Sequence, residues 1–183
     1  TGPVEKVLVT VGGSDPNKIT STIIRAIIQT GLKIQSDIVI GPMATEPEKI
    51  ITQANHISPK PTIHFGTSEM ARLMFEADLA IGVTGTTSWE RCCLGLPSIT
   101  MTAANNQKDI ATALSNSGAS LLIGDVTEVK IEDIAKNLVK MVTNHKYRRL
   151  MSIAASMMCD GNGAERVANI FDQNIHSHNA NGC

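Results

Sequence analysis

The sequence predicts an α/β fold, a single doubly wound parallel sheet of about six strands. Apolar runs of strand length alternate with helical patterns along the whole chain, which is typical of parallel βαβ units. Runs such as Val7-Leu8-Val9 and Leu79-Ala80-Ile81 are apolar at every position, so we expect the strands to be covered on both faces. A length of 183 residues, 42% of them hydrophobic, is enough for one domain with its own core.

Each expected element follows from one of these patterns. Strands are expected over residues 4–11, 37–40, 62–65, 79–83, 98–102 and 120–123. Helices are expected over residues 19–30, 46–54, 68–76, 87–94, 107–116, 131–143, 145–158 and 164–173. The helix over 131–143 has the clearest pattern, since Ile131, Ile134, Ala135, Leu138, Val139 and Val142 form one apolar stripe. Residues 1–173 should form the domain, and the polar stretch 174–183 should be a flexible tail.

Composition and charge exclude several classes of partner. The chain has 16 Lys+Arg against 17 Asp+Glu, a net charge of -1, so nothing predicts binding to nucleic acid or to an acidic membrane surface. Apolar runs fall short of the ~20 residues of a membrane span, and no basic-then-apolar leader opens the chain. A small, neutral or anionic ligand is the better expectation.

The cysteines and the first residue bear on location and on chain organisation. Cys92, Cys93, Cys159 and Cys183 lack the C-x-x-C spacing of zinc or redox sites, so we expect reduced, mostly buried thiols in a cytoplasmic protein. The chain begins at Thr1, not Met, and a strand pattern follows at once, which favours an excised domain with upstream sequence missing.

The first candidate for ligand binding is Gly12-Gly13-Ser14-Asp15-Pro16, between the first strand and the first helix. Glycines at the carboxyl end of a strand let backbone N–H groups approach a phosphate. A tight turn with Asp15 as helix N-cap and Pro16 at the first helical position fits the residues equally well. The chain has neither a G-x-G-x-x-G motif nor a G-x-x-x-x-G-K-[ST] motif.

The second candidate is the stretch from Gly82 to Glu90, again a strand, a turn with glycine and a helix. Its hydroxyl residues and N–H groups suit a diphosphate, and a carboxylate one turn along suits the two hydroxyls of a ribose. The alternative is a T-x-x-E capping box made by Thr87 and Glu90, which needs no ligand. We expect Trp89 to pack between helix and sheet.

The remaining polar groups point less clearly to a ligand. Asn105, Asn106 and Gln107 follow the next strand, where amides could contact a sugar, although an ordinary N-cap is the favoured interpretation. Cys92 and Cys93 are expected in the core. His64 is expected to be an ordinary strand residue, and the five histidines show no metal-binding pattern.

Several stretches together carry a resemblance to a known family. They are VGGSDP at 11–16, EADLAIG at 76–82, GTTSWERCCLGLPS at 85–98, Asn106-Gln107 and DGNGA at 160–164. This set resembles the C-terminal domain of the UDP-sugar hydrolase of pseudaminic acid biosynthesis, which is glycosyltransferase-B-like. It is more distantly similar to the UDP-binding half of the N-acetylglucosaminyltransferase that makes lipid II. The resemblance implies a single Rossmann-like domain whose ligand is UDP or a UDP-sugar.

The resemblance also implies roles for individual residues. Phosphate contacts would come from Gly13, Ser14, Thr86 and Thr87, and Gly85 would also bind the nucleotide. Ribose contacts would come from Glu90, sugar or phosphate contacts from Asn106 and Gln107, and uracil contacts from the backbone near Phe65 and Gly66. The catalytic histidine of the family lies in an N-terminal domain without counterpart here, so no catalytic residue is expected in this chain. Neither metal nor cofactor is implied. Thr84 and Thr86 stand where the family pattern leads us to expect smaller residues.

Three functions remain open at this point. The first is the UDP-sugar-binding half of a hydrolase that releases UDP and a 2,4-diacetamido-2,4,6-trideoxyhexose on the route to a nonulosonic acid. The second is the nucleotide-binding half of a UDP-sugar-dependent glycosyltransferase. The third is a noncatalytic nucleotide-sugar-binding module.

Overall fold

The computed structural model describes residues 2–15 and 17–180, with residues 172–180 described by their backbone alone, and it contains a six-stranded parallel sheet. The strands are β1 (Lys6–Thr10), β2 (Gln35–Ile40), β3 (Thr62–Phe65), β4 (Leu79–Val83), β5 (Ser98–Thr102) and β6 (Leu121–Asp125). Their order is β3-β2-β1-β4-β5-β6, and every neighbouring pair is parallel. From β1 the chain forms β2 and β3 on one side of the sheet, and it then returns to the centre and forms β4, β5 and β6 on the other side. The expected fold is confirmed.

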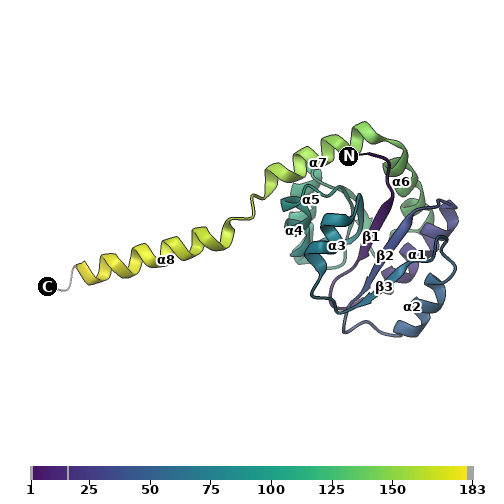
Figure 1. Cartoon of the computed structure of the whole chain (residues 1–183), viewed down its shortest axis with the longest axis horizontal. Coiled ribbons are helices and arrows are strands. Elements are labelled where there is room, and N and C mark those ends of the chain that lie inside the picture. Colours follow the sequence, from purple (N-terminus) through teal and green to yellow (C-terminus); the bar gives the residue numbers. More distant parts are fainter. Residues whose placement is uncertain (1, 16, 181–183) are drawn as a thin grey trace.

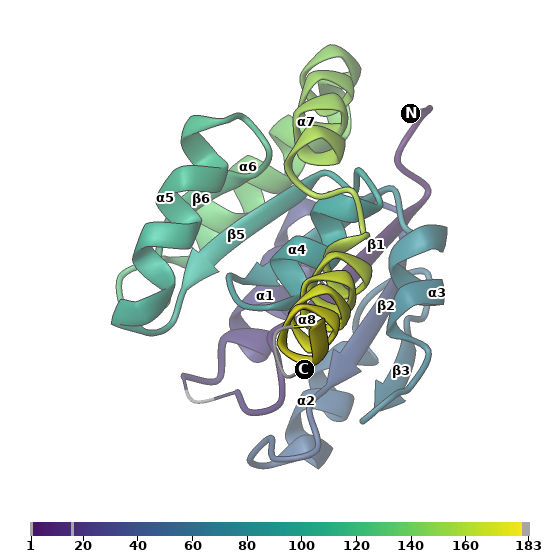
Figure 2. The same cartoon turned by 90° about the vertical axis from the view of Figure 1, so that its left-hand side faces the viewer.

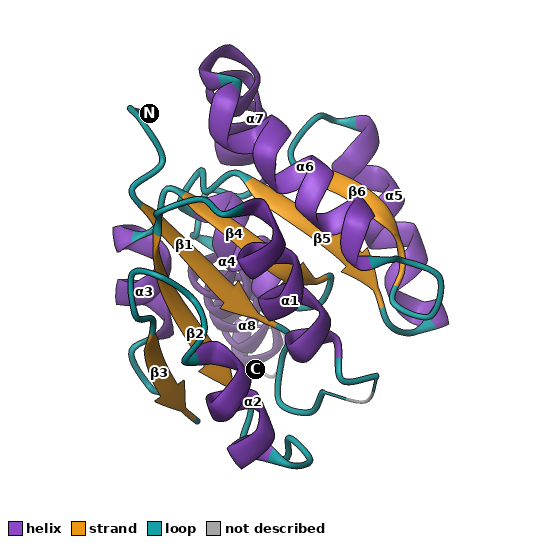
Figure 3. Cartoon of the chain, turned by 90° about the vertical axis from the view of Figure 1, so that its right-hand side faces the viewer, coloured by secondary structure: helices purple, strands orange, loops and turns teal. Residues whose placement is uncertain are grey.

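Helices cover both faces of this sheet. On one face lie α1 (Ile19–Thr30), α2 (Pro47–Ala54) and α6 (Ile131–Thr143), as Figure 3 shows. On the other lie α3 (Met70–Glu76), α4 (Thr87–Cys93) and α5 (Lys108–Asn116), the last preceded by the 3-10 turn η1 (Asn105–Gln107) (Figure 2). Helix α7 (His145–Met158) packs against α4, whereas α8 (Gly163–Ala180) projects away from the sheet (Figure 1).

The core is built from the two faces of the central strands. In β1, Leu8 belongs to the apolar cluster on the α3 side, while Val7 and Val9 belong to the larger cluster that includes α1 and α6. In β4, Ala80 and Ile81 divide between the same two clusters, and both are fully buried. Continuous apolar runs are thus explained by burial on both faces, as parallel sheets require.

A buried arginine joins the end of α6 to the start of the chain. Arg148 on α7 is only 2% exposed. Its Nη1 donates to the carbonyl oxygens of Met141 (2.6 Å) and Val142 (2.8 Å), and its Nη2 donates to that of Gly2 (2.6 Å). Because the last carbonyls of a helix have no partner within the helix, this side chain satisfies two of those of α6. Burial of this cation is therefore compensated by hydrogen bonds.

Most expected boundaries coincide with the observed ones and others differ by one or two residues, but the end of the chain differs more. Helix α8 continues through Ala180, whereas the sequence pattern predicted a helix that ends at residue 173. The prediction relied on apolar periodicity, which an exposed helix does not need; residues 164–180 contain neither glycine nor proline to stop it. Residues 181–183 of the expected tail lie outside the described residues. None of the described helices is both long and apolar enough to cross a membrane.

Candidate functional site

A cavity of about 320 Å³ opens at the carboxyl end of the sheet, where β1, β4 and β5 finish. Chain connections leave β1 and β4 in opposite directions, so this is the point at which the strand order reverses. Open α/β sheets place ligands in the crevice at such a point. The lining residues come from three loops and are Val11, Gly12, Gly13, Ser14, Val83, Thr84, Gly85, Thr86, Thr87, Ala103, Ala104 and Gln107.

The first loop is held by the loop that follows β2. Gly12 has a φ of 97°, a conformation that favours glycine. Met43 N–H donates to the carbonyl oxygen of Gly13 (2.9 Å). A Cβ on Gly41 would overlap the carbonyl oxygens of Gly12 and Gly13, so only glycine lets these two loops lie this close. The backbone at Gly13 and Ser14 is thereby fixed at the wall of the cavity.

Asp15 serves the helix that follows this loop. Its buried carboxylate accepts hydrogen bonds from the N–H groups of Ile19 (2.7 Å) and Thr20 (3.1 Å). Helix α1 begins only at Ile19, after Lys18 in a left-handed conformation, so Asp15 caps it from farther away than the expected N-cap position. Pro16 lies outside the described residues. The capping and ligand-binding interpretations of this segment are compatible, because they use different residues.

The capping box of Thr87 and Glu90, the alternative to ligand binding at the second loop, is not formed. Helix α4 begins at Thr87, its N-cap residue Thr86 has a helical conformation, and no side chain caps the helix. Instead Ser88 Oγ accepts a hydrogen bond from Gly85 N–H (3.2 Å). Thr87 is therefore inside the first turn, where its hydroxyl cannot act as a T-x-x-E cap. Thr84, 1% exposed, also lines the cavity, and within residues 2–15 and 17–180 its hydroxyl has no hydrogen-bond partner.

Helix α4 buries a different face from the one its apolar residues predicted. Its inward residues are Ser88, Arg91 and Cys92, which follow the i, i+3, i+4 spacing of one helix face. Cys93 is exposed, so its expected core position is wrong. Trp89 is 37% exposed, so it is not enclosed between helix and sheet as expected. Burial of Cys92 is confirmed. The described cysteines are free thiols, and Cys183 lies outside the described residues.

Arg91 was not singled out by its sequence pattern, because arginine usually lies at the surface. It is 1% exposed, and its Nη2 donates to the carbonyl oxygen of Val83 (3.1 Å) and to Ser88 Oγ (2.9 Å). Burial lowers the pKa of Arg91 to about 10, which still leaves the guanidinium charged at neutral pH. A cation thus lies directly beneath the turn that lines the cavity.

The third loop lines the cavity with Ala103, Ala104 and the polar residue Gln107. Gln107 Oε1 accepts a hydrogen bond from Ala103 N–H (2.8 Å), and Gln107 lines the cavity. Asn106 is exposed and does not line it. The expected N-cap at Asn105 or Asn106 is not formed, since both lie inside η1 and Ala104 precedes it. The 3-10 turn replaces the cap, and the hydrogen bond from Ala103 N–H to Gln107 Oε1 closes it.

Three other candidate residues lie apart from this cavity. Phe65 (54% exposed) ends β3 at the edge of the sheet, two strands from β1, and Gly66 follows it. Gly66 has a φ of 47°, and its N–H donates to the carbonyl oxygen of Ile40 (3.2 Å). Glu90 is exposed and borders a separate apolar cavity of about 370 Å³, between α3, α4 and the turn before α8.

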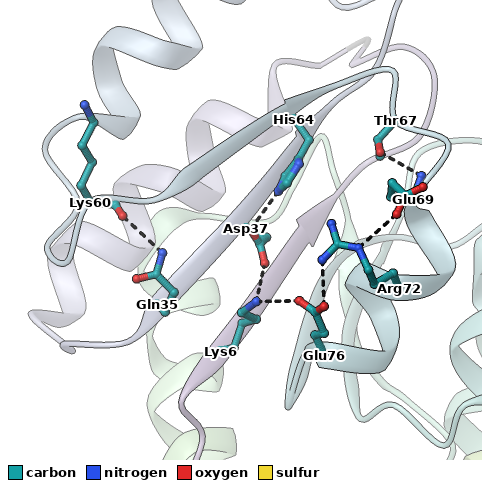
Figure 4. A network of polar contacts seen from close by, with 9 residues as sticks. All are labelled: Lys6, Gln35, Asp37, Lys60, His64, Thr67, Glu69, Arg72 and Glu76. Carbon is teal, nitrogen blue, oxygen red and sulfur yellow. Dashed lines mark hydrogen bonds and ion pairs between the residues drawn. The ribbon is translucent and has the colours of Figure 1, made fainter.

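His64 belongs to a network of charged side chains on the sheet face beside α3, drawn in Figure 4. Its Nε2 lies 2.8 Å from Asp37 Oδ1, and Asp37 Oδ2 lies 3.2 Å from Lys6 Nζ. Lys6 also donates to Glu76 on α3 (3.0 Å). His64 does not line the cavity described above, and its contacts join β1, β2 and β3 to α3. Across the parts of the chain that the structure describes, no three His, Cys, Asp or Glu side chains gather as a metal site.

Comparison with solved structures shows which proteins share this fold. MurG from Acinetobacter baumannii superimposes with a TM-score of 0.77 and 18% identity, over 94% of this chain and 51% of that one. A co-structure of S. aureus MnaA with UDP gives a TM-score of 0.68 and 13% identity, over 95% of this chain and 47% of that one. At these identities the likeness is one of fold.

Sequence comparison identifies the family of the chain as well as its fold. The spore coat polysaccharide biosynthesis protein SpsG of Bacillus subtilis is 25% identical over 166 residues, which cover 90% of this chain and 49% of SpsG. The chain thus spans about half the length of SpsG and of MurG. Residues 6–170 match the glycosyltransferase family 28 C-terminal domain, which is nearly the whole chain. The protein therefore belongs to the glycosyltransferase family 28 C-terminal domain family.

Proposed function

We propose that this chain is the nucleotide-sugar-binding domain of a two-domain enzyme and that it holds the diphosphate of a UDP-sugar in the cavity between β1, β4 and β5. The observation that carries the proposal is the position of that cavity at the strand-order reversal, with glycine and hydroxyl residues on its walls. Backbone N–H groups and hydroxyls are donors to phosphate oxygens, and neither adds a like charge. Membership of the family and the UDP in the MnaA co-structure support the choice of nucleotide.

In this proposal the ligand extends along the carboxyl edge of the sheet. Phosphate oxygens contact Gly13, Ser14, Gly85, Thr86 and Thr87, and the unpartnered hydroxyl of Thr84 is a further donor to them. Uracil reaches the backbone of Phe65 and Gly66 at the end of β3, about 10 Å from β1 at two strand spacings. Glu90 accepts from the ribose hydroxyls between them. Gln107, and Asn106 beside it, contact the sugar or the phosphates.

The cavity offers binding groups without a general base. Its lining contains no His, Asp, Glu, Lys, Cys or Tyr among the described residues. Breaking an anomeric C–O bond needs a base to activate the attacking water or hydroxyl, together with stabilisation of the departing diphosphate. We therefore place the base on a second domain. Helix α8 supports this arrangement, because it projects from the sheet with Val167, Ile170 and Phe171 more than half exposed, an apolar surface suited to a partner domain (Figure 1).

Two reactions fit this site. The stretches at 85–98 and 160–164 favour a hydrolase that releases UDP and a 2,4-diacetamido-2,4,6-trideoxyhexose for nonulosonic acid synthesis, because they resemble that enzyme in sequence. Membership of glycosyltransferase family 28 favours transfer of the sugar to an acceptor. Both use the same nucleotide cavity, and the second domain decides between water and an acceptor as the nucleophile.

Binding of UDP to the chain tests the proposal directly. UDP should raise the melting temperature and release or absorb heat on titration, because a ligand that binds only the folded state stabilises it by mass action. Binding should be weak, with saturation at millimolar UDP, since half of the cleft is formed elsewhere. Absence of both heat and thermal shift at millimolar UDP would reject the nucleotide site.

Turnover tests where the base lies. The purified chain should release no UDP from a UDP-sugar above the uncatalysed background, because the cavity supplies no base. A coupled assay for free UDP measures this. His64→Gln is the matched control: UDP release by the parent that is lost in this variant would assign a catalytic role to the His64–Asp37 pair and overturn the assignment of the base to a second domain.

A further inference from the structure

Arg91 differs from the other fully buried arginine in how its charge is compensated. Arg148 donates to three backbone carbonyl oxygens at the α6 end and at Gly2. Arg91 uses only Nη2, while its buried Nε and Nη1 have no hydrogen-bond partner in the described chain. No carboxylate among the described residues forms an ion pair with it. Arg148 has no ion pair among the described residues either, so the two unpaired donors distinguish Arg91. A buried cation with unpaired donors is costly, and its retention points to a negative charge supplied from outside the folded chain.

The position of Arg91 shows where that charge would lie. Its two acceptors, Val83 O and Ser88 Oγ, belong to the loop between β4 and α4. Val83 lines the cavity, and Ser88 Oγ accepts from Gly85 N–H, which belongs to another lining residue. The guanidinium is therefore one residue layer beneath the cavity wall. Thr84 on the same loop has a buried hydroxyl without a partner, a second observation that points to a ligand at this wall.

We propose that Arg91 is a positioning residue that fixes the Val83–Ser88 loop and whose uncompensated charge makes the cavity select a nucleoside diphosphate over less charged nucleotides. This inference rests on the proposed function, because it takes the diphosphate as the missing counter-charge. Arg91 does not touch the ligand. It acts through the loop it holds and through its field, which protein screens far less than water does. The preference for UDP over uridine should therefore depend on the charge at position 91.

The experiment compares UDP, UMP and uridine by calorimetric titration against the parent and three variants. Arg91→Gln keeps an amide donor for the loop but removes the charge, and Arg91→Lys keeps the charge without the planar fork. Arg148→Gln is the matched control, since it removes the charge of the other buried arginine, which lies in the first turn of α7 and does not line the cavity. Melting temperatures of all four proteins establish that each is folded.

Arg91→Gln should weaken UDP binding on the order of tenfold, UMP binding less, and uridine binding hardly at all. Arg91→Lys and Arg148→Gln should keep the ratio of UDP to uridine affinity within about threefold of the parent. Three results would overturn the role of the charge. They are an equal loss of affinity for UDP and uridine in Arg91→Gln, an unchanged UDP affinity in Arg91→Gln, and a loss of UDP affinity in Arg91→Lys as large as that in Arg91→Gln. If Arg91→Gln does not fold, Arg91→Lys alone tests the proposal. A ratio of UDP to uridine affinity like that of the parent agrees with the proposal, and a tenfold loss of UDP affinity contradicts it. A parent that binds no UDP rejects the proposed function itself, which separates the two failures.

Discussion

Gly82→Ala is expected to destabilise the fold by at least about 3 kcal/mol. Gly82 lies in β4 opposite Thr10 of β1, at the centre of the sheet. A Cβ at this position would overlap the carbonyl oxygen of Thr10 and lie 2.8 Å from its carbonyl carbon. Both atoms are backbone, so no flexible side chain can move aside. The two central strands would have to separate, which breaks hydrogen bonds and opens the core.

Urea unfolding followed by circular dichroism measures this effect. Gly163→Ala is the matched control, because a Cβ there meets no atom within 4 Å and should change the free energy of unfolding by less than about 1 kcal/mol. A Gly82→Ala protein that unfolds within 1 kcal/mol of the parent would show that β1 and β4 are not held this closely.

Gly82 also illustrates what local sequence cannot reveal. In the chain it belongs to the same glycine-containing stretch as Gly85, and both suited a phosphate turn. In the structure a Cβ on Gly85 would meet nothing within 4 Å, whereas one on Gly82 would enter a neighbouring strand. The difference depends on the pairing of β4 with β1, some seventy positions apart in sequence. The local sequence around Gly82 does not show how closely β1 approaches it in the fold.

Elements with strong periodicity could be predicted, and polar contacts between elements could not. Helix α6 has the expected bounds, because Ile134, Ala135 and Leu138 of its apolar stripe are buried against the core. Val139, which the stripe also included, is 39% exposed, so that position was predicted wrongly. Helix α4 was oriented wrongly, since its buried face holds Ser88 and Arg91 while Trp89 remains partly exposed. The buried Arg91 donates a hydrogen bond to the carbonyl oxygen of Val83, eight residues before it in the chain. This contact depends on the folded turn between β4 and α4, so the sequence pattern of the helix does not reveal it.

Part of the candidate site could be predicted from the sequence and part could not. The loops after β1 and β4 could be brought together from the sequence, because carboxyl ends of parallel strands meet at one edge of a sheet. The structure places Gly13, Ser14 and Gly85 to Thr87 around one cavity. It leaves Phe65, Glu90 and Asn106 outside that cavity, so their roles rest on a ligand that extends past it.

Glu90→Gln is expected to weaken UDP binding roughly ten- to hundredfold while it leaves the stability of the fold almost unchanged. A charge-assisted hydrogen bond contributes about 1.5–3 kcal/mol, and the amide replaces one acceptor oxygen by a donor. Stability should not change, because Glu90 is exposed and forms no capping box with Thr87. Glu132→Gln is the matched control, since Glu132 is an exposed acidic residue in the first turn of α6 and does not line the cavity. The UDP affinity of the Glu132→Gln protein should equal that of the parent.

The ligand supplies the second half of this test. Calorimetric titration with 2′,3′-dideoxy-UDP removes the two ribose hydroxyls that Glu90 is proposed to bind. Parent and Glu90→Gln proteins should then bind the dideoxy nucleotide almost equally, because the contact in question is already missing from both complexes. If Glu90→Gln binds UDP as tightly as the parent does, the ribose assignment is wrong, and Glu90 is a solvent-facing residue that borders the apolar cavity between α3 and α4.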